Sequence, residues 1–172
     1  LHILSHMNKQ KGVAGFLLAN GALGDTDALT IRRELIENDK VEAIIVLPRE
    51  LFITTDISVT LWILNQNKKG GMWHGRKQRN REGEILFMDL RQWTENPVKG
   101  EQKKKVILKD NQIKRATEIY FKWQAEGTDG TNYAEPELYR SVRIDEADGI
   151  EANNFSLVPS RYIEFVDRDS AI

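Results

Sequence analysis

Six basic side chains fall within residues 68–81 and are of the type that binds a phosphate backbone. No acidic residue follows until Glu82, and glycines and Trp73 lie between the cations. Cations that contact DNA phosphates release condensed counterions, and glycines let a backbone follow a groove. The pattern predicts a DNA-backbone contact, and a solvated surface loop is the alternative that it leaves open. The six cations are Lys68, Lys69, Arg76, Lys77, Arg79 and Arg81.

Other residue types with chemical potential lack the partners that a site requires. His2 and His6 are four residues apart, as two metal ligands on one helix face would be, but no third ligand follows nearby. His74 lies among basic loop residues, where a solvated side chain is expected. The glycines between residues 12 and 24 build neither a G-x-G-x-x-G turn nor a P-loop. We therefore predict no metal site, no complete nucleotide site and no catalytic residue within this sequence.

Phe52 is an aromatic residue on a short segment that follows an apolar run ending at Leu47 and Pro48. If that run is a parallel strand, Phe52 lies at the carboxyl edge of the sheet, where ligands bind in open α/β sheets. A single phenylalanine is more often a core residue than a ligand contact. The residue by itself leaves both interpretations open.

The first half of the sequence has the pattern of an α/β fold. Apolar runs at 13–19 and 41–47 predict buried strands, and residues 28–39 between them have the spacing of an amphipathic helix after the capping residues Asp25 and Asp27. A strand, helix, strand unit with short links makes a right-handed crossover, so we expect the two strands to be parallel.

The second half predicts a different arrangement. The strand-like runs 57–64 and 84–88 have no helix between them, so we expect an antiparallel hairpin with a long connection. Residues 109–126 predict a helix whose buried face carries Ile113, Ala116, Tyr120 and Trp123. Residues 127–149 have little periodicity and predict an irregular connection, and 155–163 have enough apolar residues to dock on a core.

Composition restricts the class of protein. The 172 residues are 40% hydrophobic and 30% charged, with a net charge of -1, which is typical of one globular domain with an appendage. No apolar run approaches the roughly 18 residues that span a bilayer, and the absence of cysteine fits a reducing, cytoplasmic setting. The sequence begins without methionine, in what has the spacing of a helix end, so we expect it to be a fragment of a longer protein.

Several segments, in order and spacing, closely resemble the modification (M) subunits of type I restriction-modification enzymes, an adenine-N6 DNA methyltransferase family. The helix that ends at Ala125 and Glu126 and the tail at 157–163 resemble the closing segments of the same family, so the resemblance covers almost the whole chain. The main segments are 12–23, 31–37, 41–52, 57–64 and 83–91.

The resemblance implies the C-terminal half of a class I methyltransferase sheet, with 13–19, 41–47 and 57–64 as its fifth, sixth and seventh strands. The seventh strand is then antiparallel and lies between the other two. Residues 1–95 would form the target-base side of the catalytic domain, and residues 96–172 a C-terminal helix and tail that could dock another subunit. The family's glycine-rich S-adenosylmethionine loop and its Asn-Pro-Pro-Phe motif have no match in this sequence. We therefore assign no cofactor-binding residue.

The resemblance also implies a function and partners. The full protein would transfer a methyl group from S-adenosylmethionine to adenine N6 in DNA, together with a specificity (S) subunit and a restriction (R) subunit. Phe52 occupies the position at which related enzymes stack an aromatic ring on the flipped target base. We expect the fragment to be inactive and to self-associate. A non-catalytic module that binds DNA or another subunit is the alternative function.

Overall fold

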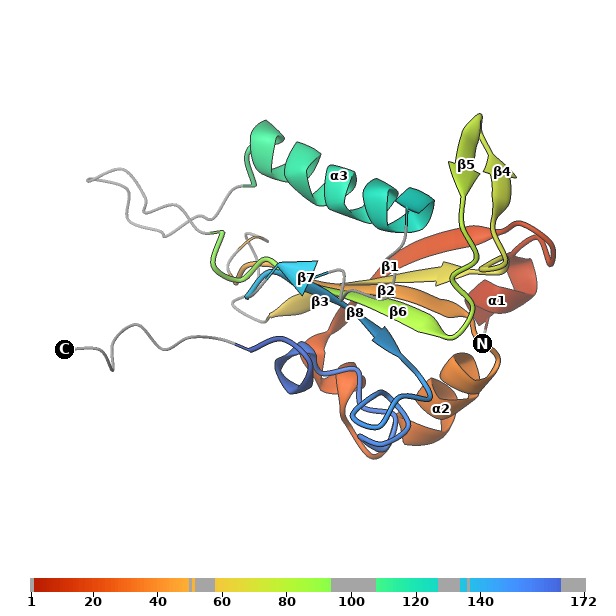
Figure 1. Ribbon diagram of the computed structural model, residues 1–172. Helices are drawn as coiled ribbons and strands as arrows, with labels where there is room; N and C mark the ends of the chain where they lie inside the picture. Colours follow the sequence, from red (N-terminus) through yellow and green to blue (C-terminus); the bar gives the residue numbers. More distant parts are fainter. Residues whose placement is uncertain are drawn as a thin grey trace.

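A mixed β-sheet organises the chain in our computed structural model, which describes residues 2–49, 51, 58–93, 108–126, 134–135 and 137–164. The sheet strands, in spatial order, are β1 (Val13–Ala19), β3 (Val59–Asn65), β2 (Val41–Val46), β6 (Glu84–Asp89), β8 (Tyr139–Arg143) and β7 (Ala134–Glu135). A separate hairpin consists of β4 (Gly71–Trp73) and β5 (Arg76–Gln78). The helices are α1 (His2–His6), α2 (Leu29–Glu37) and α3 (Asp110–Glu126), with 3-10 turns at Asn20–Leu23 and Pro159–Arg161 (Figure 1).

The strand β3 is inserted between two parallel strands. It pairs antiparallel with β1 on one side and with β2 on the other, so β1 and β2 run in the same direction. Strand β6 pairs parallel with the free side of β2. The parallel relation of 13–19 and 41–47 is confirmed, and so is the inserted strand that the family resemblance implied.

Two sequence-based expectations for the second half are wrong. Strands β3 and β6 do not form a hairpin, because β2 lies between them, and their connection instead folds into β4 and β5. Within 127–149, β8 is not irregular but pairs antiparallel with β6. Its sequence Tyr-Arg-Ser-Val-Arg has no apolar run that would predict a strand. Only Val142 is fully buried, and its neighbours are half-buried or exposed.

Strand β1 was expected to be buried and is exposed instead. It forms one edge of the sheet, and its side chains are exposed or half-buried along its whole length. Val13, Leu17 and Leu18 are among the large hydrophobic side chains that face solvent. A run of apolar residues therefore indicated the strand correctly but not the contacts that it makes in this chain.

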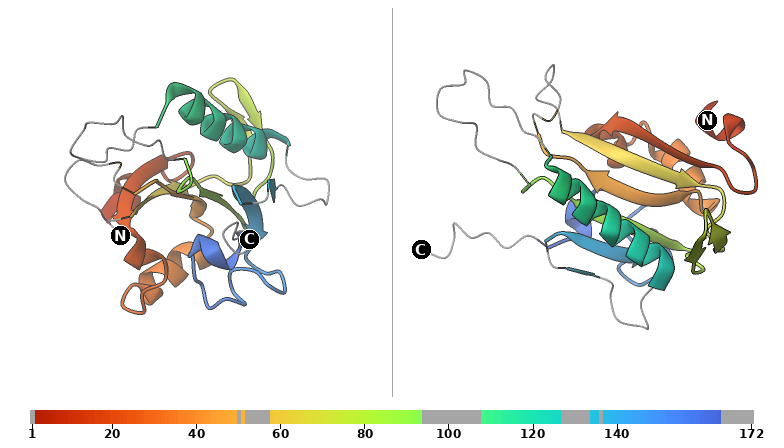
Figure 2. Two further views of the ribbon diagram at one scale, coloured as in Figure 1. Left: turned by 90° about the vertical axis from the view of Figure 1, so that its left-hand side faces the viewer. Right: turned by 90° about the horizontal axis from the view of Figure 1, so that it is seen from above.

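The two faces of the sheet are covered by different parts of the chain. Helix α2 and residues 150–163 pack on one face, and α3 packs on the other (Figures 1 and 2). On the α3 face, Ile119 and Trp123 contact apolar residues of β2 and β6, whereas Ile113, expected on the buried side, is exposed. Thus α3 lies over the middle of the sheet.

Residues 155–163 dock on the core, as their apolar content predicted. Leu157, Tyr162 and Ile163 are buried against the α2 side of the sheet. Buried Arg32 of α2 donates through Nε to the carbonyl of Phe155 at 2.7 Å, which fixes this segment to the helix. Described parts of 96–172 thus share a sheet and a core with 1–95, and subunit docking by that region stays a prediction.

Candidate functional site

The carboxyl ends of the parallel strands β1, β2 and β6 meet at one edge of the sheet, which is where α/β folds bind ligands. The segment that follows β2 leaves the sheet at this edge. Leu51 is half-buried against the α3 side of the core. Phe52, the residue expected to stack on the target base, lies outside the described residues. Its role stays a prediction.

Polar side chains at the same edge are bonded to one another. The Thr60 hydroxyl donates to Asn20 Oδ1 at 2.5 Å, and the buried Asp89 carboxylate accepts from Arg91 Nη2 at 2.6 Å. The hydrogen bond with Asp89 raises the pKa of the Arg91 guanidinium. These two pairs are thus satisfied within the chain, and no residue of this edge is assigned to a cofactor.

The basic segment 68–81 lies at the opposite ends of the strands, beside the amino ends of β2 and β6. Lys68 Nζ is buried and bonds to Asp39 Oδ1 at 2.6 Å, to the carbonyl of Val41 at 3.0 Å and to that of Glu84 at 2.6 Å. Burial lowers the pKa of this lysine, and the contact with Asp39 opposes that shift. Lys68 therefore ties the loop to the sheet and is not available to a phosphate.

Arg79 and Arg81 also stabilise the fold, because each forms an ion pair within it. Arg79 Nη1 lies 2.5 Å from Glu84 Oε2, and its Nε donates to the carbonyl of Trp123 at 2.8 Å, in the last turn of α3. A cation there complements the negative end of the helix dipole. The fully buried Arg81 forms an ion pair with Glu42 at 2.7 Å. The expectation of six cations without a counter-charge is wrong. Asp39 and Glu42 reach the loop from a distant part of the sequence, and Glu84 follows the loop directly.

Three basic residues remain for the predicted DNA contact. Lys69 and Lys77 are exposed and form no ion pair with any described residue. Arg76 lies over the ring of Phe121, with its Cζ 3.6 Å from the centroid. The predicted contact with the DNA backbone therefore depends on Lys69, Lys77 and Arg76. DNA contact by these three residues stays a prediction.

A buried polar cluster around Glu42 was missed by the sequence interpretation. Glu42 Oε2 accepts from the Tyr120 hydroxyl and from Asn65 Nδ2, both at 2.7 Å, while Oε1 accepts from Arg81. Gln124 Nε2 donates to the Tyr120 oxygen at 3.0 Å. Burial is the main cause that raises the pKa of Tyr120, followed by the Glu42 charge, so this hydroxyl stays a proton donor.

A β-bulge explains how Glu42 reaches this cluster. The pairing of β2 with β3 shifts register between Val41 and Ala43, and Glu42 is the extra residue. A bulge redirects a side chain that regular alternation would place elsewhere. The cluster joins β2, β3, the end of the basic loop and α3. The signal in the sequence was an acid within an otherwise apolar strand, which requires a buried counter-charge.

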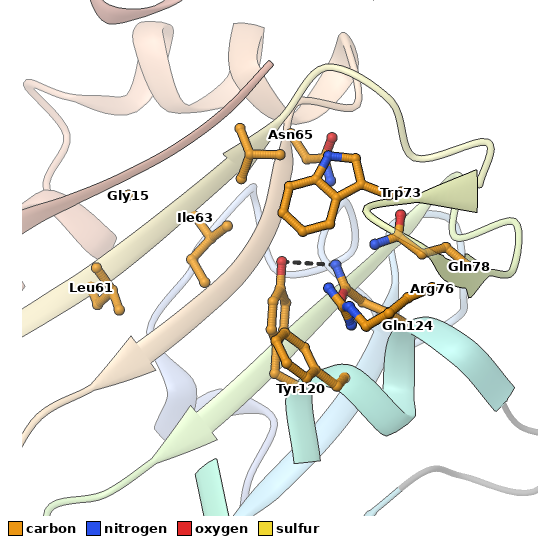
Figure 3. Close-up of a pocket in the computed structure, with 11 residues that line it drawn as sticks. Gly15, Leu61, Ile63, Asn65, Trp73, Arg76, Gln78, Tyr120 and Gln124 are labelled. Atoms are coloured by element: carbon orange, nitrogen blue, oxygen red, sulfur yellow. Dashed lines mark hydrogen bonds between the residues drawn. The ribbon is translucent and has the colours of Figure 1, made fainter. Parts of the chain in front are cut away.

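Next to the cluster lies a cavity of about 280 Å³. Figure 3 shows its walls: Tyr120 and Gln124 of α3 face Trp73 and Arg76 of the hairpin, and Leu61 and Ile63 of β3 lie along the sheet. Its other lining residues are Val13, Gly15, Asn65, Gln78 and Phe121. The lining is mainly apolar, so the cavity suits a hydrophobic group with few polar contacts.

The histidines do not assemble into a metal site in the described residues, which contain no cluster of three or more histidine or acidic side chains able to hold a metal ion. The rings of His2 and His6 lie edge to face, 4.4 Å apart. His74 packs against Trp73 in the same way.

In the described parts of the chain, no helix is both long and apolar enough to cross a membrane.

Comparison with solved structures gives the fold. The chain is similar to the methyltransferase subunit of a type I restriction-modification system from Streptococcus thermophilus, with a TM-score of 0.71 and 22% identity. The match covers 95% of this chain and 29% of that one. The mixed sheet with its inserted strand is thus a part of the methyltransferase fold found in type I M subunits.

A family model identifies the protein more closely. The model described as N-6 DNA Methylase matches residues 1–170, and the chain belongs to this family. Curated relatives are the HindI methylase subunit of Haemophilus influenzae, 31% identical over 98% of this chain, and the MjaIX methylase subunit of Methanocaldococcus jannaschii, 30% identical over 100% of it. The chain spans 33% and 28% of the lengths of these relatives.

Proposed function

We propose that this chain is the target-base part of a type I modification subunit that methylates adenine N6 in DNA. One observation carries the proposal: in a member of the N-6 DNA Methylase family, the segment after β2 leaves the sheet at the carboxyl edge, and β3 returns antiparallel between β1 and β2. Ligands bind in α/β sheets at this edge, and the assignment of Phe52, which follows that segment in the sequence, to the target base is part of the proposal.

The chemistry requires the target adenine to leave the duplex, because its amino group is otherwise held in a base pair. An extruded base loses its stacking, and an aromatic ring restores it. Phe52 would provide that ring. S-adenosylmethionine would supply the methyl group, and we assign no residue of this chain to cofactor binding.

The proposal includes partners. In the complete enzyme a specificity subunit would read the DNA sequence and a restriction subunit would cleave unmodified DNA, and the assembly would work in the cytoplasm. This chain spans about a third of its relatives, so methyl transfer would need the remainder of a polypeptide of their length. The 172 residues alone would be inactive.

A labelled-methyl assay tests the proposal. We expect a polypeptide of the relatives' length that contains this chain, assembled with its specificity subunit, to transfer tritiated methyl groups to adenine in DNA. The 172-residue chain should show neither transfer nor binding of S-adenosylmethionine in calorimetry. Failure of the long polypeptide to label adenine would contradict the proposed function. Micromolar cofactor binding by the 172 residues would contradict the assignment of cofactor binding to the remainder of the longer polypeptide.

A further inference from the structure

We propose that the β4–β5 hairpin enters the major groove of DNA and places Met72 against the edges of the bases, away from the target adenine. The inference rests on the proposed function, because that function makes DNA the partner. It goes beyond the backbone contact predicted for Lys69 and Lys77, since it names the groove, an apolar contact and the position of the contact along the duplex.

The hairpin has an inner and an outer face. Residues that lie opposite each other in antiparallel strands share a face. Trp73 pairs with Arg76, and Arg76 lies over the ring of Phe121 on α3, so this pair forms the inner face. Met72 pairs with Lys77 on the outer face. At 71% exposed, Met72 is the most exposed large hydrophobic residue in the described part of the chain.

The hairpin is held in place before any partner binds. The amide of Arg79 donates to the carbonyl of Gln124 at 2.8 Å, beside the end of α3 (Figure 1). At Gly70, where φ is 90°, a Cβ would come within 2.4 Å of the Arg79 carbonyl oxygen, so the base closes tightly. His74 and Gly75 both have positive φ, as in a type I′ turn. Binding therefore orders few additional residues, which favours affinity.

The dimensions of the hairpin fit the major groove. Its two strands of three residues each extend for about 10 Å and lie about 4.8 Å apart. The major groove of B-DNA is about 12 Å wide and about 8.5 Å deep, and it admits a two-stranded β-ribbon. An apolar side chain in this groove contacts the methyl group of thymine. Met72 is the residue of the outer face that can make such a contact.

The charge of the outer face favours DNA over a protein partner. Residues 68–81 contain no acidic side chain. The acids that reach this loop neutralise its buried cations and leave Lys69 and Lys77 exposed. Lysine is depleted at protein–protein interfaces, whereas basic side chains are the usual contacts of DNA phosphates. Two lysines beside one exposed methionine therefore match phosphates that flank a groove.

The fold also gives the position of the contact along the duplex. The hairpin lies at the amino ends of β2 and β6, and the proposed target-base site lies at their carboxyl ends. The six residues of β2 extend for about 20 Å, which corresponds to about six base pairs at 3.4 Å each. A duplex that runs along the strands would thus meet the hairpin about six base pairs from the target adenine.

Photo-crosslinking in the assembled enzyme tests the contact. The amino acid p-benzoylphenylalanine replaces Met72 in the long polypeptide, and the complex with its specificity subunit and target DNA is irradiated. We expect crosslinks to bases about six base pairs from the target adenine. The matched control carries the same amino acid at Ile31 on α2, where the residue is 48% exposed, and its crosslinking to DNA should be at least tenfold lower.

An affinity measurement tests the apolar contact without a label. Met72→Ala should weaken DNA binding about tenfold, because burial of the side chain is lost. The slope of log K against log salt should stay unchanged, because an uncharged side chain releases no counterion. Met72→Leu should keep most of the affinity. Ile31→Ala is the control and should change neither quantity. A displaced hairpin would differ from these results, since loss of the lysine contacts would also lower the slope.

The outcomes separate this inference from the proposed function. Methyl transfer without crosslinks from residue 72 to DNA would overturn the inference alone. Crosslinks at the expected bases without methyl transfer would contradict the proposed function alone. Crosslinks to the specificity subunit would make the hairpin a protein contact, and unchanged affinity of Met72→Ala would remove the apolar contact. Either of these two results would overturn the inference.

Discussion

Glu42 shows how one buried residue organises several distant parts of the chain. Its carboxylate accepts hydrogen bonds from β3, from the end of the basic loop and from α3. A buried carboxylate is costly unless it is paired and its oxygens are hydrogen-bonded, and here both conditions hold. The residue therefore fixes where α3 and the hairpin lie on the sheet.

Removal of its charge partner should strongly destabilise the fold. In the 172-residue chain, Arg81→Met leaves Glu42 buried and uncompensated, which should cost about 3–5 kcal/mol in the free energy of unfolding. Lys122→Ala breaks the exposed pair with Glu126 and should cost less than about 1 kcal/mol. Urea unfolding measures both. A loss at Arg81 as small as that at Lys122 would show that the buried pair contributes little.

Phe52 is the residue that the proposed function assigns to the target base. Stacking of a base on an aromatic ring contributes about 1–3 kcal/mol, which corresponds to roughly five- to more than a hundredfold in the population of a held base. In the active long polypeptide, Phe52→Ala should lower methylation by a factor in that range, and Phe52→Tyr should retain most activity. The rate of methyl transfer measures the effect.

A structural role for Phe52 would give a different set of results. Loss of a buried phenylalanine costs about 3–5 kcal/mol of stability and lowers activity without any stacking. The thermal midpoint and the fluorescence of 2-aminopurine at the target position distinguish the two roles. A large drop in midpoint with persistent flipping of the probe would make Phe52 a core residue.

The β4–β5 hairpin is an element with two different sides. Its base is fixed by Lys68, Arg79 and Arg81, whose charges are neutralised within the fold. Arg76 faces α3, and Lys77 and the preceding Lys69 face solvent. The exposed Lys69 and Lys77 can release counterions from DNA, whereas a buried, paired cation cannot reach a phosphate.

The salt dependence of DNA binding tests the hairpin. Replacement of Lys69 and Lys77 by alanine in the assembled enzyme should weaken binding to specific and non-specific DNA alike. The slope of log K against log salt should fall by about 0.9 for each phosphate that is no longer neutralised. The matched control replaces Lys9 and Lys114, two exposed lysines elsewhere, and should leave the slope unchanged. An unchanged slope in the hairpin variant would make the loop a solvated surface feature.

At the scale of the whole molecule, β1 is an edge of the sheet, and no described strand pairs with its outer side. In β1, the carbonyl of Gly12 and the amide of Asn20 bond toward β3, so the backbone groups of residues 13, 15, 17 and 19 face the free edge. The strand contains no charge, no proline and no bulge, which are the features that protect natural edge strands from pairing. This edge can accept another strand.

Self-association of the 172-residue chain is the expected consequence. Sedimentation should show dimers or larger species that grow with concentration, and Leu17→Lys should shift the population toward monomer because a charge on the edge opposes pairing. Ile31→Lys, at a similarly exposed position on α2, should not. A clean monomer of the unmodified chain over a wide concentration range would contradict the prediction.

The sequence by itself predicted strands at 13–19, 41–47 and 57–64 and a helix at 109–126, which correspond to β1, β2, β3 and α3, because hydrophobic spacing is a local property. The resemblance of those segments also gave the family and the inserted strand. Tertiary structure alone decided that Lys68, Arg79 and Arg81 are structural cations and that β8 belongs to the sheet. Asp39 and Glu42, the Trp123 carbonyl that accepts from Arg79, and the strand partner β6 are far from them along the chain. Pairings at such separations depend on which elements pack together, and no local pattern records them.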